Sequence, residues 1–303
     1  MSARQPLISI GLPVYNGQNF VADAIKCTLA QTVSDFELII SDNNSSDDTV
    51  SICRGFAAAD SRIRLHCNEQ NLGVAPNYNR VFQLSCGRYF KWITHDDLFA
   101  PAFVECCIEA LENDERAVLV FPRLGFVDAT GQLLRTQQTP DLSVVGSTAT
   151  SRVKQLMRFE AESEEIFWCQ YGVMRRSTLE DTSLMGPYNG SDQVLLLELA
   201  LKGNLKQVQQ ELFLRREHPA ASTMRSGWTA RERAAFVYAG DRRSAVFPYF
   251  RMLKEHIACL RGGRIALPEK AVCTLSILRR FFSQWKYFAY ELFYSSLEAV
   301  RGR

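Results

Sequence analysis

Short apolar runs alternate with segments of helical periodicity along the first part of the chain, and this alternation constrains the fold more than any other feature. The apolar runs end in loop-forming residues, as buried parallel strands do. The expected strands are residues 7–13, 36–41, 63–67, 89–94 and 117–121, and the expected helices between them are residues 19–31, 47–59, 75–85 and 102–113. This order predicts an α/β fold with a mostly parallel sheet.

The pattern becomes less regular after residue 122. Residues 128–132, Asp-Ala-Thr-Gly-Gln, predict a hairpin turn. Helices are expected at residues 151–159 and 191–201, with a strand at 205–215. Beyond residue 227 the periodicity predicts helices and gives no strand signal. We therefore expect a boundary near residue 225.

Composition excludes several classes of protein. A chain of 303 residues with 47% hydrophobic and 11% aromatic residues is not intrinsically disordered. No stretch approaches the ~20 uncharged apolar residues of a membrane span, and the first residues lack the features of a signal peptide. Nine scattered cysteines without a Cys-x-x-Cys pair favour reduced thiols over a disulfide or zinc framework. The expected location is the cytoplasm.

Charge divides the chain into two unlike parts. Residues 225–303 contain 15 Lys and Arg against 6 Asp and Glu, a balance of +9, and the totals leave 20 against 27, or −7, for residues 1–224. The aromatic, basic segment 279–294 has the composition of a helix that lies on anionic lipid, which would place the protein at the inner face of the membrane. Alternatively, this helix packs on the main domain with Arg279, Arg280 and Lys286 facing solvent. The acidic body argues against nucleic acid as a partner.

Polar and acidic residues cluster where the expected strands end, which is where open α/β sheets bind ligands. No Gly-x-Gly-x-x-Gly and no Gly-Lys-Ser/Thr phosphate loop is present. A phosphorylated ligand would therefore meet a divalent cation in place of a glycine cradle. Asp96 and Asp97, directly after the strand at residues 89–94, are the best candidates to bind it. Alternatively, Asp97 caps the helix that begins near residue 102.

Taken together, these motifs resemble the inverting glycosyltransferases of glycosyltransferase family 2, which have the GT-A fold. The resemblance spans residues 6–220. Several nucleotide-sugar-binding positions match in order: Pro13, Val14, Tyr15, Asn16, Asp42, Asn44, Asn71, Gly73, Asn77 and Asp96. The segment Thr94-His95-Asp96-Asp97 is similar to the family's Asp-x-Asp site, with histidine in place of the first acid.

The resemblance implies roles for individual residues in the donor site. Asp42 would accept the N3–H of uracil or its equivalent, and Asp97 would coordinate Mn²⁺ or Mg²⁺. Asp96 would hold the ribose or share the metal, and His218 could add a metal ligand. For Asp47 we favour a structural role as the cap of the second helix.

The resemblance also implies a catalytic base and an acceptor side. The segment that begins at Gly186 matches the family's base motif, with Ser191-Asp192 in place of the usual Glu-Asp, so Asp192 would be the base. Because Asp192 falls in the first turn of a helix, we expect the helix dipole to lower its pKa. Trp168, Tyr171 and Arg175 would lie on the acceptor side, where the two aromatic rings could stack on a sugar or belong to the core.

The sequence thus predicts a metal-dependent, inverting enzyme that uses a nucleotide sugar, with UDP favoured, and a glycan or lipid-linked acceptor in a bacterial polysaccharide, lipopolysaccharide or glycolipid pathway. Residues 1–224 would form the GT-A domain, with a nucleotide-sugar half (1–122) and an acceptor half (123–224), and residues 225–303 a helical extension. Tail helices of this kind often pair, so a homo-oligomer is a further expectation. The alternatives are a nucleotidyltransferase and a non-catalytic, membrane-docked module that binds sugar or nucleotide.

Overall fold

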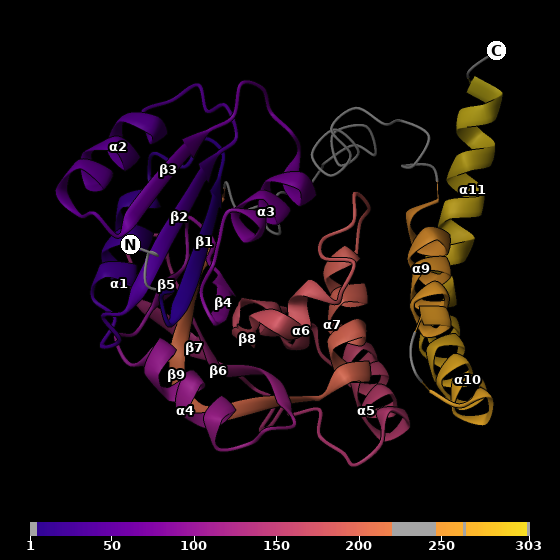
Figure 1. Cartoon of the computed structure of the whole chain (residues 1–303). Helices are drawn as coiled ribbons and strands as arrows, with labels where there is room; N and C mark the ends of the chain where they lie inside the picture. The colour runs from indigo at the N-terminus through magenta and orange to yellow at the C-terminus, as the bar shows by residue number, and fades with distance from the viewer. Residues whose placement is uncertain (1–4, 220–246, 263–264, 302–303) are drawn as a thin grey trace.

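The computed structural model describes residues 5–219, 247–262 and 265–301. Its centre is a nine-stranded sheet with the order β3-β2-β1-β4-β8-β6-β9-β5, in which β7 pairs with β6 (Figure 1). The strands are β1 Ile8–Val14, β2 Phe36–Asp42, β3 Ile63–Cys67, β4 Tyr89–Trp92, β5 Leu98–Phe99, β6 Ala117–Val127, β7 Leu133–Thr136, β8 Val173–Arg175 and β9 Asn204–Arg216. The helices before β9 are α1 Val21–Leu29, α2 Thr49–Ala59, α3 Val74–Gln83, α4 Phe103–Glu112, α5 Ala149–Glu162, α6 Arg176–Glu180 and α7 Ser191–Lys202, and η1 Glu164–Tyr171 is a 3-10 helix.

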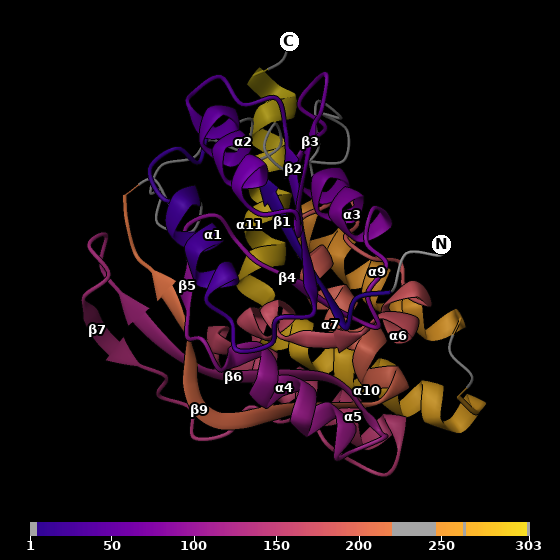
Figure 2. The same ribbon diagram turned by 60° about the vertical axis from the view of Figure 1, so that its left-hand side comes forward.

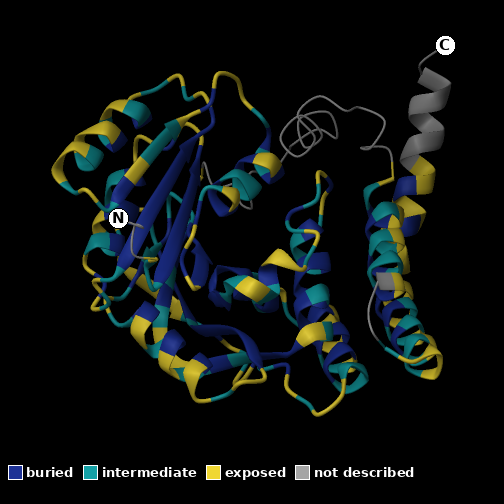
Figure 3. Ribbon diagram, viewed as in Figure 1, coloured by how far each residue is buried: buried dark blue, intermediate teal, exposed yellow. Residues whose placement is uncertain are grey.

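The first four strands are parallel, because a helix between each strand and the next (α1, α2 and α3) returns the chain to the same end of the sheet. Every residue of β1 and β2 is buried, since helices cover both faces (Figure 3). This agrees with the predicted α/β class and mostly parallel sheet. It also brings the carboxyl ends of β1, β2 and β4 to one edge.

The second part of the sheet is mixed. Strand β6 is longer than the predicted strand at residues 117–121 and pairs with β9 in parallel along most of its length. The predicted hairpin turn is confirmed: β6 and β7 are antiparallel, and the Asp128 carboxylate accepts hydrogen bonds from the amides of Thr130 and Gln132. The short elements β5, β8, α6 and η1 were not predicted, because so few residues carry no readable periodicity.

Three helices follow in the remaining described residues: α9 Pro248–Gly262, α10 Leu267–Ser283 and α11 Trp285–Arg301. The expected boundary near residue 225 lies outside the described residues. Helix α9 packs on α7 and helix α10 on α5, while α11 contacts α9 (Figure 2). The predicted helix at 279–294 is divided at Gln284, where α10 ends.

One prediction about these helices is wrong. Arg280 does not face solvent, because α10 turns its side chain into the interface with α5 and α7, where only 5% of the residue is exposed. Arg279 and Lys286 are exposed, as the alternative expected. Within the described residues, no helix combines the length and apolarity needed to cross a bilayer.

Candidate active site

A cavity of about 750 Å³ opens at the carboxyl ends of β1 and β4. Its walls come from the loop after β1, from α3, from the loop after β4, from η1, from the turn before α7 and from the end of β9. The predicted site residues on its lining are Pro13, Val14, Tyr15, Asn16, Asn77, Asp96, Asp97, Trp168, Tyr171, Asp192 and His218. The fold therefore gathers residues that are up to 205 positions apart (13 to 218) around one space.

The loop after β1 is held by the turn that precedes α2. Asn16 has a left-handed backbone (φ 50°), and its side-chain oxygen accepts a hydrogen bond from the amide of Ser46. Asp47 accepts from the amide of Thr49, the first residue of α2, and from the amide of Gln18. Asp47 therefore has a structural role, because it bonds the first amide of α2 and secures the loop. It is not the cap itself, since the N-cap position is Asp48, whose side chain makes no capping bond.

Asp42 and Asn44 are not on the lining of the cavity. Asp42 is the last residue of β2 and is only 1% exposed, and its Oδ2 accepts from the amide of Ser45. Its Oδ1 is buried and has no hydrogen-bond partner among the described residues. Because an unpaired buried carboxylate oxygen is costly, this atom is a candidate to accept a hydrogen bond from a ligand. Asn44 has φ 63° and makes the sharp turn that follows.

An amide network forms the wall beside β2. Asn43, which the motif comparison did not select, lines the cavity, and its Nδ2 donates to Asn71 Oδ1 and to the carbonyl of Gly73. Asn71 and Gly73 lie behind Asn43, off the lining. Asn77 does reach the lining, and its Oδ1 accepts from the Ser41 hydroxyl at 2.7 Å.

Asp97 is fixed by both oxygens. Its Oδ2 accepts from the Thr94 hydroxyl at 2.6 Å, and its Oδ1 accepts from the amide of Arg216 at 2.9 Å. It does not cap α4, whose preceding residue, Ala102, makes no side-chain bond, so the capping alternative is wrong. Burial, together with the neighbouring charge of Asp96, raises the pKa of Asp97 to about 7.

Asp96 and His218 face each other, with 3.1 Å between Asp96 Oδ2 and His218 Nε2. Burial would raise the pKa of Asp96, but the nearby imidazoles of His95 and His218 outweigh it and lower that pKa. As they stand, no three Asp, Glu, His or Cys side chains of the described part are placed so that together they could hold a metal ion. Two carboxylates and an imidazole nevertheless match the ligands of Mg²⁺ or Mn²⁺, which bind few protein groups and take further ligands from phosphate and water.

Asp192 lies in the first turn of α7, after a sharp turn at Gly190 (φ 81°). The preceding loop is fixed to α3, since the side-chain amide of Asn79 bonds both the carbonyl and the amide of Met185. The expected lowering of the Asp192 pKa is wrong as a net effect: burial raises this pKa, and it outweighs the backbone amides of Gln193 and Asp192 at the helix start, which lower it. A raised pKa makes the carboxylate a stronger base.

Aromatic rings form the side of the cavity opposite β1. Trp168 and Tyr171 stack with 6.0 Å between ring centroids, and the guanidinium of Arg215 lies 4.2 Å from the Trp168 ring. Tyr78 bonds the Tyr171 hydroxyl, and Tyr188 lines the cavity nearby. Tyr78 and Tyr188 were not predicted as site residues, although Tyr78 follows Asn77 and Tyr188 lies in the segment that leads to Asp192.

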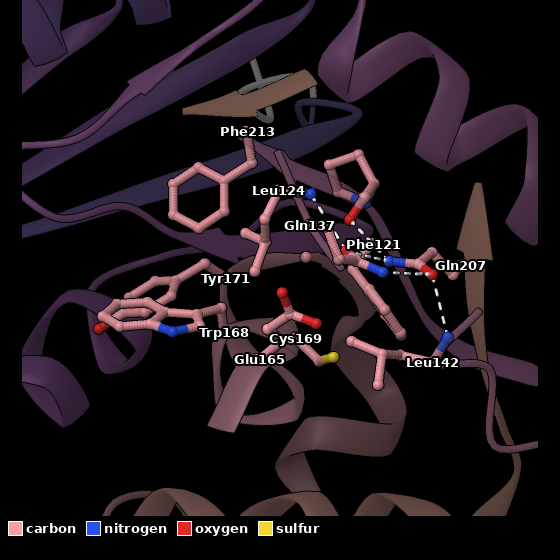
Figure 4. Close-up of a pocket in the computed structure, with 12 residues that line it drawn as sticks. Phe121, Leu124, Gln137, Leu142, Glu165, Trp168, Cys169, Tyr171, Gln207 and Phe213 are labelled. Carbon is pink, nitrogen blue, oxygen red and sulfur yellow. Dashed lines mark hydrogen bonds between the residues drawn. The ribbon is translucent and has the colours of Figure 1, made fainter. Parts of the chain in front are cut away.

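Behind this aromatic wall is a gap too narrow for a water molecule, between η1 and the sheet (Figure 4). The side-chain amides of Gln137 and Gln207 bond each other there. The residues around this gap pack behind Trp168 and Tyr171. The gap does not extend the cavity.

Arg175 does not reach the cavity. Its guanidinium donates to the carbonyls of Ala117 and Leu111, which ties β8 to β6 and to α4. The prediction that Arg175 lies on the acceptor side is therefore wrong. From its position in the sequence beside aromatic residues, a half-buried arginine that donates to backbone carbonyls cannot be distinguished from an arginine that binds a ligand.

Comparison with known proteins gives a consistent result. The sequence model of "Glycosyl transferase family 2" matches residues 9–182. The chain is 30% identical over 131 residues to a chondroitin synthase of Escherichia coli, which is 43% of this chain and 19% of that protein. It is 34% identical over 124 residues to an uncharacterized glycosyltransferase, RP339, of Rickettsia prowazekii, which is 41% of this chain and 38% of that protein. The chain thus spans well under two thirds of either relative.

Among solved structures, the fold resembles a fragment of S. aureus TarS in complex with UDP-GlcNAc, with a TM-score of 0.67 and 14% identity. The match covers 91% of this chain and 72% of that one. A second structure of the same fragment, S. aureus TarS 1–349, matches with a TM-score of 0.65 and 13% identity over the same shares. At this identity the likeness concerns the fold, which is that of GT-A glycosyltransferases.

Proposed function

Because this chain belongs to glycosyl transferase family 2, we propose that it transfers a sugar, with inversion, from a UDP-sugar to a hydroxyl of a glycan or lipid-linked acceptor. One observation carries the proposal: Asp96, Asp97, His218 and Asp192 line a single cavity at the carboxyl ends of β1 and β4. Carboxylates from two separate parts of the chain on one cavity would supply what the transfer needs, a site for the diphosphate and a base for the acceptor.

The nucleotide would bind on the β1–β2 side. The unpaired Oδ1 of Asp42 supports a role as acceptor for a base N–H, which is the feature that favours uracil. Because Asp42 is behind the lining, a small movement of the turn at Asn44 would be required to expose this oxygen. Tyr15, 45% exposed at the rim, is placed to lie against the base.

Asp97, Asp96 and His218 would hold Mn²⁺ or Mg²⁺. A cation bound there would offset the negative charge on the departing nucleoside diphosphate. The hydrogen bonds from the Thr94 hydroxyl and the Arg216 amide, which fix the carboxylate of Asp97, support this role. Carboxylates that bind metal ions in proteins are usually oriented by hydrogen bonds from neighbouring groups.

Asp192 would act as the base. The acceptor oxygen forms a bond to the anomeric carbon while the bond from that carbon to the diphosphate breaks, and the electron pair leaves with the nucleotide. The hydroxyl proton passes to the Asp192 carboxylate, whose pKa is raised by burial. Attack from the face opposite the leaving group inverts the anomeric centre. Trp168 and Tyr171 would stack on the acceptor sugar.

The bacterial sources of the relatives support a role in building a bacterial polysaccharide, lipopolysaccharide or glycolipid. We also propose that α10 and α11 contact an anionic membrane. Phe282, Trp285 and Tyr287 are each more than half exposed, and they are interspersed with the exposed cations Arg279 and Lys286. Exposed aromatic and basic residues on one helical segment are typical of membrane-surface binding.

Calorimetric titration of the full chain with UDP and GDP, with and without Mn²⁺, tests the donor site. We expect UDP to bind in a metal-dependent manner and Asp97→Ala to abolish this binding. Turnover of UDP-sugars, with Asp192→Asn as the inactive control, then tests the transfer. If neither nucleotide binds in the presence of metal, the donor assignment is wrong.

A further inference from the structure

A buried ionic cluster joins four helices at a point that the transfer mechanism above does not use. Arg280 of α10 lies 3.2 Å from Glu160 Oε2 of α5 and donates to the Tyr249 hydroxyl of α9 and to Gln193 Oε1 of α7, each at 3.1 Å. Glu160 and Arg280 are at most 5% exposed. Burying this pair is expensive, so the cluster calls for an explanation beyond stability.

The cluster lies directly beside the proposed base. Gln193 is the residue after Asp192, and its amide, like that of Val194, bonds the carbonyl of Gly190 to start α7. The guanidinium of Arg280 therefore holds the first turn of α7 from the side away from the cavity. Helix α10 reaches this turn from a position 87 residues later in the chain.

Helix α9 packs against the turn that precedes α7. A Cβ at Gly190 would lie 2.2 Å from Met252 Sδ, so α9 packs directly against the backbone of that turn. The guanidinium of Arg251 is 5.0 Å from the ring of Tyr188, which lines the cavity. In Figure 1, α9 and α10 run beside α7 and α5. Three contacts from two C-terminal helices thus converge on residues 188–193.

We propose that Arg280 is a positioning residue, which fixes the first turn of α7 through Gln193 and thereby directs the Asp192 carboxylate into the cavity. The inference rests on the proposed role of Asp192 as the base. In this proposal the C-terminal helices have a role on the acceptor side of the site, in addition to the membrane contact proposed above. His256 belongs to the cluster as a neutral side chain, since its Nδ1 bonds the carbonyl of Met252 and burial lowers its pKa to about 4.

Two variants separate positioning from stability. Gln193→Leu removes only the acceptor on α7 and leaves the pair of Arg280 with Glu160 in place. The double variant Glu160→Gln/Arg280→Met removes both buried ionisable groups together, so neither is left without its partner. We expect it to restore much of the stability that Arg280→Met alone loses. Arg279→Met is the matched control, because Arg279 is the neighbouring arginine on α10 and is exposed.

Hydrogen exchange of the full-length protein is the first readout, and it requires no activity. We expect the amides of Gln193 and Val194 to exchange about tenfold faster in Gln193→Leu and in the double variant, as loss of a hydrogen bond to a charged group implies. The amides of β1 and the Arg279→Met control should be unchanged. Wild-type exchange at these two amides in both variants would overturn the proposal.

The second readout is kinetic. We expect kcat to fall about tenfold in both variants while the donor KM changes by less than about twofold, since the donor half is untouched. If kcat returns to the wild-type value in the double variant together with Tm, Arg280 is merely structural and the proposal fails. A wild-type protein that transfers no sugar would refute the proposed function instead, and the exchange rates alone would then decide whether α10 holds this turn.

Discussion

The carboxylate of Asp97 accepts a hydrogen bond from the backbone amide of Arg216, 119 residues further along the chain. The Arg216 guanidinium in turn donates to the carbonyl of Asp96 and to the Asp23 carboxylate. The end of β9 is therefore bonded to the acidic loop after β4 by both backbone and side chain. The position of Asp96 and Asp97 therefore depends on β9 as well as on β4, the strand that they follow.

Asp97→Asn should separate metal binding from folding. Asparagine keeps an oxygen for the Arg216 amide and an amide that can donate to Thr94, so we expect Tm to stay close to wild type. Loss of the charge should weaken Mn²⁺-dependent UDP binding about 100-fold in calorimetry. Asp48→Asn, an exposed carboxylate whose side chain does not cap α2, is the control. UDP binding of wild-type strength in Asp97→Asn would contradict the assigned role.

Asp192→Asn should lower kcat by about 10²- to 10⁴-fold and leave UDP affinity unchanged, because it removes the proton acceptor alone. Asp181→Asn, on an exposed residue after α6, should have no effect on kcat.

The pH dependence of kcat tests the same residue. A base must be deprotonated, so activity should be lost as the pH falls through the pKa of Asp192. Since burial raises that pKa, the midpoint of the acid limb should lie above the ordinary aspartate range. A profile that stays flat down to the ordinary aspartate pKa would argue against Asp192 as the base.

Lys91→Met should stabilise the protein at neutral pH. Lys91 is fully buried beneath the cavity and 3.7 Å from the Phe103 ring centroid, and burial lowers its pKa to about 7. Between that pH and the unfolded pKa of about 10.4, the unfolded chain binds a proton that the folded chain does not, so the wild-type free energy of unfolding rises with pH. The advantage of the variant should therefore be a few kcal/mol near pH 7 and shrink toward pH 10.

Urea denaturation at several pH values measures this difference. Lys26→Met, on the exposed side of α1, should give a difference from wild type that does not depend on pH. A Lys91→Met advantage that grew with pH would contradict the assigned protonation state.

Phe282→Glu and Trp285→Glu should abolish sedimentation with vesicles that contain anionic lipid, and should leave Tm unchanged because both side chains are well exposed. Leu133→Glu makes a similar change on the exposed β7 and should still sediment. Deletion of residues 279–303 is unsuitable for this purpose, because it also removes the buried Arg280 and Phe281. Sedimentation of the two variants at the wild-type level would refute the membrane proposal.

The sheet and the acidic loop could be predicted because strands and strand ends are local signals. Residues 36–41 are mostly apolar and are followed directly by Asp42, and the mostly apolar strand at residues 89–94 is followed, after His95, by Asp96. The antiparallel insertion of β8 could not be predicted, since three residues have no periodicity of their own.

The side chains that were misplaced have a common cause. Arg280 and Arg175 were expected to be at a surface or in a binding site because they are charged, yet both satisfy partners inside the protein. Likewise, the pKa of Asp192 was expected to follow the helix dipole, whereas desolvation by the surrounding cavity wall dominates. Partners from distant elements decide such cases, and a single sequence does not reveal them.

The contacts of Met252 with Gly190 and of Arg280 with Gln193 restrict how this enzyme could be recombined with its relatives. A chimera that exchanges the acceptor-side segment alone would join a foreign turn to the native α9 and α10, whose surfaces fit the original one. A chimera that takes residues 185–202 and residues 248–283 from the same parent would keep the matched surfaces together. Under the proposed function, a change on the acceptor side would therefore involve two stretches of sequence that are far apart in the chain.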